Sequence, residues 1–398
     1  MSQAISQKRQ HNGPAFWSYG FRPFFLSAGL FAGVAIPVWV LMITGIESVA
    51  FHYAPRDWHV HEMVFGFLAS VITGFLLTAM PNWTERPPLR GFPLMVLWAI
   101  WVAGRLAGTA SWFTPLVSAL IDGVFLVIVA GIVWREILAA KAWERLPMGV
   151  LISLFASANL LFHGLFLNHV ATDLAERMAL VLVMVLLALI GGKITPGFTE
   201  DFFIQEGVSK QPAPFSWFDG LSVLVVGLAG LAWMINLGAR VTGGAFVVAG
   251  VIHLIRLSRW YGWLTWREPL VLMLHVGYGW LAMSFLFLGA AMLGFGLHVE
   301  DAVHALTTGA VGVMTLAVMT RASLGHTGRA KHAGPLTVLI YLLVNLGAMA
   351  RVFGPNLPLS GGVIIGVAAG CWSGAYLLFI AGYGHILFGP NIEEESEH

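Results

Sequence analysis

The sequence predicts an all-α membrane protein, a polytopic bundle of about 12 transmembrane helices, and three observations predict it. The 398 residues are 58% hydrophobic and only 10% charged, and the mean hydropathy is +0.80. A soluble globular protein carries about a quarter charged residues. Apolar stretches of about 20 residues, long enough to cross a bilayer, recur along the whole chain, and short connectors rich in proline and polar residues separate them.

The predicted spans follow one another closely and leave no room for a further domain. The eighth predicted span is short and the twelfth is rich in glycine, so a count of eleven or thirteen spans stays open. The longest expected loop is about residues 197–216. We expect one transmembrane domain over 22–388, between an N-terminal tail (1–21) and an acidic C-terminal tail (389–398). The spans are 22–44, 60–80, 92–110, 115–138, 147–168, 176–196, 217–237, 241–257, 268–295, 302–321, 334–353 and 360–387.

The distribution of basic residues predicts the orientation. With the N-terminus inside, the inner segments hold 16 Lys and Arg and the outer segments hold 5. Positive charge favours the cytoplasmic side, so both termini are expected in the cytoplasm. The first fifteen residues are polar, so we expect an uncleaved first helix and no signal peptide.

A faint internal repeat is visible at a shift of 243 residues. It aligns His61 with His304 and Gly66 with Gly309, and it relates residues 1–140 to 268–388. Glycine-rich helices often match by chance, so an accidental match is the alternative. If the repeat is real, two related four-helix units flank a central four, and His61 and His304 come to equivalent depths.

The cysteine count and the charge exclude several kinds of site. Cys371 is the single cysteine, which excludes a four-cysteine cluster, a covalent haem attachment and an internal disulfide. Any haem must therefore be held non-covalently. The net charge is only +1, and the basic residues are scattered over short loops, so no nucleic-acid partner is expected.

Histidines near or within the spans are the strongest functional signal, because imidazole is costly to desolvate and is a common ligand of haem iron and copper. Converting position to depth at 1.5 Å per residue divides them into two layers. The outer half of the membrane contains His59, His61, His163 and His304. The inner half contains His253, His275 and His385, and His326 lies in the inner loop after the span 302–321. Two layers are expected of two metal centres, or of one centre with a proton-handling cluster.

The site assignments follow from this division, and each has a plainer alternative in which the side chain only hydrogen-bonds a neighbouring helix. His59 and His61 are two apart and face opposite ways on a helix. Glu62 is the expected catalytic residue, as a proton carrier or a partner of an imidazole N–H. The expected metal ligands are His59, His61, His163, His304, His275, His326 and His385. The expected cofactor-binding residues are His61, His304, His163, His275, His253, Arg105 and Arg351.

Polar groups within spans are functional by default. Arg105 and Arg351 can hold haem propionates or simply extend to the surface, and Asp122 and Asn159 belong to the same class of intramembrane polar residues.

Three motifs resemble the NnrS family: GFRPFF at 20–25, WHVHEMVFGF at 58–67 with its continuation to residue 91, and LAVMTRASLGHTGR at 316–329. LHVGY at 274–278 fits as well, and the similarity covers essentially the whole chain. The resemblance implies a bacterial inner-membrane protein of about twelve helices with haem b and copper. It also implies a link to nitric oxide, denitrification and nitrosative stress.

The leading functional hypothesis is a haem- and copper-containing oxidoreductase that binds and detoxifies nitric oxide, for instance by reducing it to N₂O. Two electrons and two protons are needed for each pair of NO molecules. The electron donor is open, either a membrane quinol or an external redox protein, and membrane lipid is the other expected partner. The alternatives are a proton-coupled transporter and a haem or copper delivery protein.

Overall fold

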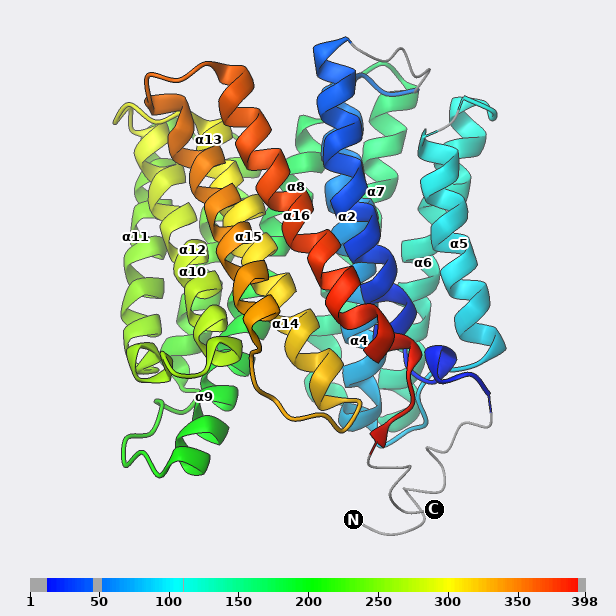
Figure 1. The fold of residues 1–398 in the computed structure, drawn as a ribbon. Coiled ribbons are helices and arrows are strands. Elements are labelled where there is room, and N and C mark those ends of the chain that lie inside the picture. The colour runs from blue at the N-terminus through cyan, green and yellow to red at the C-terminus, as the bar shows by residue number, and fades with distance from the viewer. Residues whose placement is uncertain (1–12, 46–51, 110, 393–398) are drawn as a thin grey trace. The chain divides into compact units, whose positions relative to one another are not determined.

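The computed structural model describes residues 13–45, 52–109 and 111–392, and over these residues it is helical without a β-strand. Twelve of its helices are long and apolar enough to cross a membrane (Figure 1). The predicted all-α membrane bundle is therefore confirmed. The cytoplasmic position of the termini stays a prediction.

The spans agree with the expected ones except at the sixth. There a continuous helical run covers Asp173–Glu206, built from α8 (Asp173–Leu186), the π-helical η4 (Leu187–Gly191) and α9 (Gly192–Glu206). The expectation of a loop from about residue 197 is wrong, because helix continues to Glu206. Pro196 leaves the carbonyl of Gly192 without its helical partner, and Arg256 donates to that oxygen at 3.4 Å.

The chain forms two compact units. Unit 1 comprises Met1–Ala179, Ala322–Ala330 and Phe379–His398. Its helices are α2 (Phe21–Thr44), α3 (Pro55–His61), α4 (Ala69–Thr84), α5 (Phe92–Thr109), α6 (Pro115–Ala140), α7 (Leu146–Leu167) and the first residues of α8. A buried aromatic core holds them together, with Phe21, Phe24 and Phe125 fully or almost fully enclosed.

Unit 2 comprises Leu180–Arg321 and Lys331–Leu378. Its helices are the rest of α8, α9, α10 (Trp217–Met234), α11 (Ala239–Ser258), α12 (Pro269–Met292), α13 (Val299–His304), most of α14 (Gly312–Gly325), α15 (Pro335–Phe353) and most of α16 (Gly361–Phe388). Helices α11 and α12 pack closely, because a Cβ added at Gly289 would lie 2.7 Å from the carbonyl oxygen of Gly243. Small residues at such contacts are typical of membrane helices.

Two π-helical segments follow predicted histidines. Segment η2 (Glu62–Leu68) begins directly after His61, and η6 (Ala305–Val311) begins directly after His304. Their limits are 243 residues apart, the offset at which the sequence aligns with itself, although the duplication stays a prediction. A π-helical turn leaves backbone groups without their usual partners and is frequent at functional sites. In unit 1, the Trp101 indole N–H donates to the carbonyl of Gly66 at 3.0 Å.

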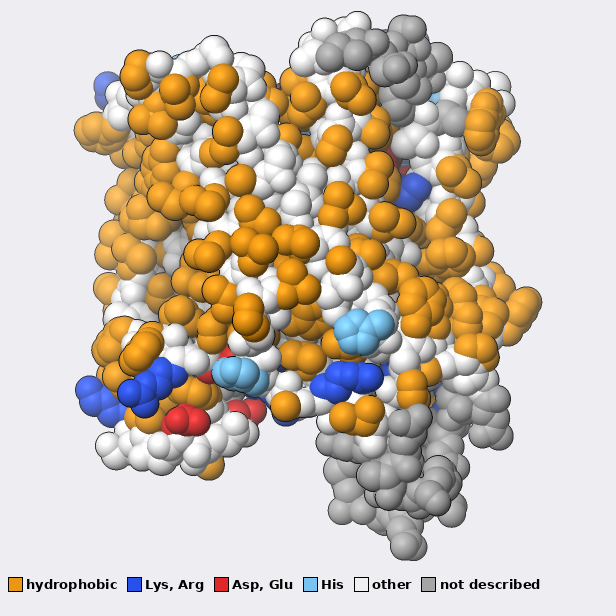
Figure 2. Space-filling view, in the orientation of Figure 1, with side chains coloured by type: hydrophobic (Ala, Val, Ile, Leu, Met, Phe, Trp, Pro, Cys, Tyr) orange, Lys and Arg blue, Asp and Glu red, His pale blue; other side chains and the backbone are white. Residues whose placement is uncertain are grey.

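The surface fits a lipid environment. Large apolar side chains such as Leu120, Leu224 and Leu342 are more than half exposed. Figure 2 shows hydrophobic side chains over most of the length of the helices, with the charged ones mainly near helix ends. Lipid-facing helices of a membrane bundle are expected to look this way.

Candidate metal centre

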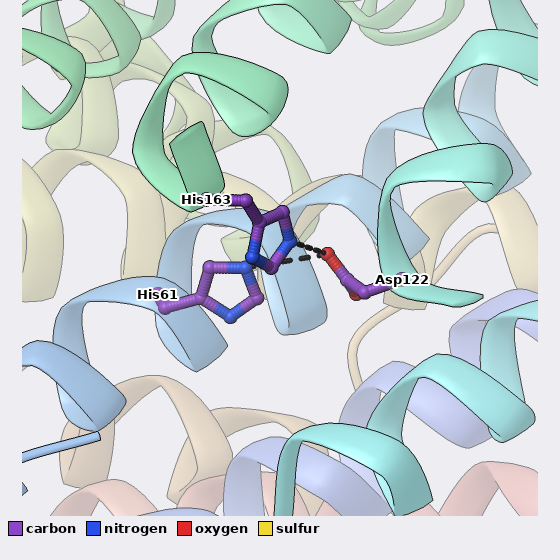
Figure 3. A group of neighbouring side chains, drawn as sticks. All are labelled: His61, Asp122 and His163. Carbon is purple, nitrogen blue, oxygen red and sulfur yellow. Dashed lines mark hydrogen bonds and ion pairs between the residues drawn. The ribbon is translucent and has the colours of Figure 1, made fainter. Parts of the chain in front are cut away.

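Three helices of unit 1 bring His61, Asp122 and His163 together (Figure 3). Oδ2 of Asp122 lies 2.8 Å from Nε2 of His163 and 3.3 Å from Nε2 of His61. One possible ligand atom from each residue lies within 4.8 Å of the other two, and all three side chains are buried. This group can hold a metal ion.

Local sequence explains how each helix presents its side chain. Pro55 opens α3, which places His61 at the junction with the π-helical segment. Helix α6 begins at Pro115 with Thr114 as its N-cap, so Asp122 lies about two turns inside the helix. Asn159 and His163 are four apart on α7 and therefore share one face.

The other ring nitrogen of each histidine is held as well. Nδ1 of His61 lies 3.0 Å from Oε1 of Glu62, and Nδ1 of His163 lies 2.8 Å from the Tyr53 hydroxyl. With the proton on Nδ1, each imidazole donates to its neighbour and keeps the Nε2 lone pair for a metal. Metal-binding histidines in proteins are typically oriented in this manner.

Tyr53 touches both imidazoles. Its ring stacks on His61 with centroids 5.5 Å apart, and only 5% of the residue is exposed. Burial is the main cause that raises the pKa of the Tyr53 phenol above its ordinary value, and the charge of Glu62 adds to it. The hydroxyl therefore stays protonated and neutral at physiological pH.

Arg105 links the two carboxylates of the cluster. It donates to Oε2 of Glu62 and to Oδ1 of Asp122, which leaves Oε1 and Oδ2 to face the histidines. All three side chains are buried. With both imidazoles neutral, as metal binding requires, two carboxylates and one guanidinium leave one negative charge, and a bound cation would balance it.

Small residues make room for this ion network. A Cβ added at Gly108 would lie 2.8 Å from Oε1 of Glu62, and one at Gly104 would lie 3.0 Å from Oδ1 of Asp122. A Cβ at Gly66 would meet the Arg105 guanidinium. Glycine at these three positions lets the backbones approach the charged groups directly.

Asn159 completes the cluster. Its Nδ2 donates to Oδ2 of Asp122 at 2.9 Å, and its Oδ1 lies 3.1 Å from Nε2 of His61. The amide thus bridges two of the three candidate ligands and fixes their separation.

The donor set fits a single metal ion better than a haem. Two imidazoles and a carboxylate suit copper, zinc or iron. The rings of Tyr53, Phe65, Phe162 and His163 all lie within 5.5 Å of the His61 ring, centroid to centroid. This packing leaves no room for a flat macrocycle on His61.

The remaining predicted residues of unit 1 lie elsewhere. His59 stacks on Trp39 at 4.3 Å. His326 is exposed and contacts the Phe21 ring, and His385 is exposed near the end of α16. None of the three belongs to the group around Asp122.

In unit 2, the predicted histidines have partners of their own. Nδ1 of His253 lies 2.7 Å from the Tyr278 hydroxyl, and its Nε2 lies 3.2 Å from the Ser222 carbonyl oxygen. Both ring nitrogens of His253 are therefore engaged, and its Nε2 would have to leave the Ser222 carbonyl to bind haem iron. The Tyr278 hydroxyl also accepts from Arg256, whose Nε donates to Asp219.

His275 and His304 lie in other surroundings of unit 2. Nε2 of His275 is 2.8 Å from the Thr199 hydroxyl, while its Nδ1 is buried without a hydrogen-bond partner. Nδ1 of His304 lies 2.6 Å from the Glu300 carbonyl oxygen. Arg351 pairs with Asp301 at 2.7 Å.

Asp122 was not identified from the sequence as a metal ligand, and Tyr53 was not identified as the residue that contacts both histidines. Asp122 carried a signal, since it is a carboxylate within a span. Tyr53 carried none, because it lies in a connector and reaches the site only through the fold.

A family model described as NnrS protein matches residues 15–391. No curated protein matches the chain in sequence. The matched region contains all the residues of the candidate metal centre.

Proposed function

The chain belongs to the NnrS family, and from that premise we propose that it is a membrane metalloprotein that binds nitric oxide at a copper ion and reduces it to N₂O. His61, Asp122 and His163 hold the ion. The observation that carries this proposal is the convergence of three buried ligand atoms within 4.8 Å of one another, with both outer ring nitrogens already oriented by Glu62 and Tyr53.

Copper is the metal that best combines the donor set with the family. Imidazole nitrogen binds copper well, and copper stands near the top of the affinity order for divalent ions. The uncompensated negative charge beside Arg105 attracts a cation to the site. Two imidazoles and one carboxylate leave room in the ion's coordination sphere for a small ligand such as nitric oxide.

When bound, the metal supplies a place for NO and a route for electrons. The reaction 2 NO + 2 e⁻ + 2 H⁺ → N₂O + H₂O needs a donor of electrons, either a quinol or an external redox protein. Glu62 holds a proton-accepting oxygen 3.0 Å from Nδ1 of His61. From there it can carry protons toward the site, and Arg105 keeps its carboxylate in place.

Haem b remains part of the proposal as a family property. No step is assigned to it, because among the described residues His61 and His253 do not fit axial ligands in their present packing. The reduced-minus-oxidised visible spectrum of the purified protein tests for haem independently of the copper site.

The copper proposal is tested with wild-type protein and the variants His163→Ala and Asp122→Asn, loaded with copper in detergent and dialysed. His253→Gln is the control, because it changes a buried histidine of the other unit. We expect wild type and control to retain copper, to change spectrum on addition of NO and to form N₂O with a reductant. Both site variants lose all three.

Equal copper retention in all four proteins would contradict the site assignment. Copper that binds at the site but leaves to a mild chelator, with no spectral response to NO, would favour the delivery alternative. A copper-free protein that stays so after loading would favour the transporter alternative.

A further inference from the structure

We propose that unit 2 contains a binding site for a phosphate-type oxyanion, built on the buried guanidinium of Arg321. Arg321 lies near the end of α14 and is 7% exposed. It is distinct from the metal centre, which lies in unit 1, and it does not depend on the proposed function.

The Arg321 guanidinium is buried without a counter-ion. Across the described part of the chain, Arg321 has no hydrogen bond and no carboxylate within 4.0 Å. By contrast, the buried Arg105 and Arg256 each pair with at least one carboxylate. A buried charge without a partner is strongly unfavourable. An anionic ligand would remove this cost.

An aromatic ring orients the guanidinium. The Arg321 Cζ lies 4.1 Å from the centroid of the Phe198 ring, on α9. The ring covers one side of the guanidinium, and its N–H groups remain for other partners. None of its nitrogens is among the fully enclosed atoms that lack a partner, so each keeps a small exposed area. A guanidinium edge matches the paired oxygens of a phosphate.

The nearest carboxylates do not neutralise the group. The charges of Asp201 and Glu268 both act on Arg321, but neither forms an ion pair with it. Glu268 is committed elsewhere, since it accepts hydrogen bonds from the backbone N–H groups of Leu270 and Ala333. It also lies 2.7 Å from Nδ1 of His332.

Other cationic side chains of unit 2 also lie over aromatic rings. Lys193 lies over Phe215 and Lys210 over Tyr261. Figure 2 shows Lys and Arg side chains gathered at the lower end of unit 2, beside α9. Cations held by rings keep their charge available for an outside anion. Basic residues flanking membrane spans attract anionic lipid headgroups.

The phosphate can come from a lipid headgroup or from solution, and the test separates the two. Delipidated wild type, Arg321→Met and Arg321→Lys are titrated with phosphatidylglycerol or phosphatidylcholine and followed by native mass spectrometry. The melting temperature is measured with inorganic phosphate against chloride at equal ionic strength. Arg267→Met is the matched control, since Arg267 also stacks on an aromatic ring but is exposed.

We expect Arg321→Met to weaken the relevant binding by about tenfold or more, since charge-assisted bidentate contacts are lost, and Arg267→Met to resemble wild type. Preference for phosphatidylglycerol that depends on Arg321 identifies a lipid headgroup. Stabilisation by inorganic phosphate that depends on Arg321 identifies a free anion. Arg321→Lys keeps the positive charge but loses the paired N–H donors of the guanidinium, so its binding affinity is expected to lie between those of wild type and Arg321→Met.

Two results would overturn the proposal. One is equal binding of both lipids and of phosphate by wild type and both Arg321 variants. The other is a higher melting temperature of Arg321→Met than of wild type in the presence of each ligand, which would mean that the guanidinium stays unpaired. If Arg321→Met does not fold, wild type and Arg321→Lys are compared in the same assays, and equal binding would again overturn the proposal.

Discussion

Oδ2 of Asp122 lies 2.8 Å from Nε2 of His163. The same carboxylate presents its other oxygen to Arg105. One side chain therefore joins the candidate ligand pair to the network that balances its charge. A carboxylate so placed is sensitive to substitution in two ways, through the metal and through the buried arginine.

Replacing Asp122 by Asn tests its role as a metal ligand. The amide keeps the shape but loses the charge, so we expect copper affinity to fall by more than about 100-fold, beyond the effect of changing a supporting residue. The measurement is copper retained after equilibrium dialysis against competing chelators. Copper binding within twofold of wild type would show that Asp122 is not a ligand.

Removing the Tyr53 hydroxyl tests the orientation of His163. Tyr53→Phe keeps the ring stacked on His61 but leaves Nδ1 of His163 without its partner. Loss of such a supporting contact weakens metal binding by about 10–100-fold. Tyr261→Phe makes the same chemical change in unit 2, outside the group around Asp122, and is expected to have no effect on copper affinity.

Gly108→Ala tests the close approach of α5 to Glu62. The new Cβ would lie 2.8 Å from Oε1 of Glu62, so the carboxylate must move, and overpacking of this kind destabilises by about 1–3 kcal/mol. Gly131→Ala is the matched control, because nothing lies within 4 Å of its added Cβ. Thermal unfolding in detergent is expected to show a lower melting temperature for the first variant and an equal or higher one for the second.

Arg105→Gln leaves two buried carboxylates without their shared partner. Removing one member of a buried ion pair costs about 3–5 kcal/mol, so this variant should melt far below wild type. Arg135→Gln, whose side chain is 61% exposed beside Glu136, should lose less than about 1 kcal/mol. Similar melting temperatures for the two variants would contradict the buried network.

Hydropathy was sufficient to predict the twelve spans, because each helix must present an apolar surface to lipid over the thickness of the bilayer. The extension of the sixth span to Glu206 was missed, because polar residues lower the local hydropathy there while the backbone stays helical. The helix continues through Pro196, where Arg256 donates to the carbonyl of Gly192, and it ends at Gly207 in the left-handed conformation.

The candidate site was predicted in part. His61 and His163 were both assigned as ligands from their depth, and the structure brings them to the same carboxylate. Depth alone did not decide which histidines face each other around the bundle axis. Asp122 reaches the two histidines because of the rotation of its helix, and Tyr53 because of the path of a connector. Position along the chain determines neither the rotation nor the path.

The copper K-edge X-ray absorption spectrum of copper-loaded wild-type protein tests the metal centre most directly. The predicted result is two imidazole nitrogens and at least one oxygen at about 2 Å, with no sulfur ligand, and loss of the copper signal in dialysed His163→Ala. A sulfur ligand, three or more imidazoles, or an unchanged spectrum in His163→Ala would contradict the assignment of His61, Asp122 and His163.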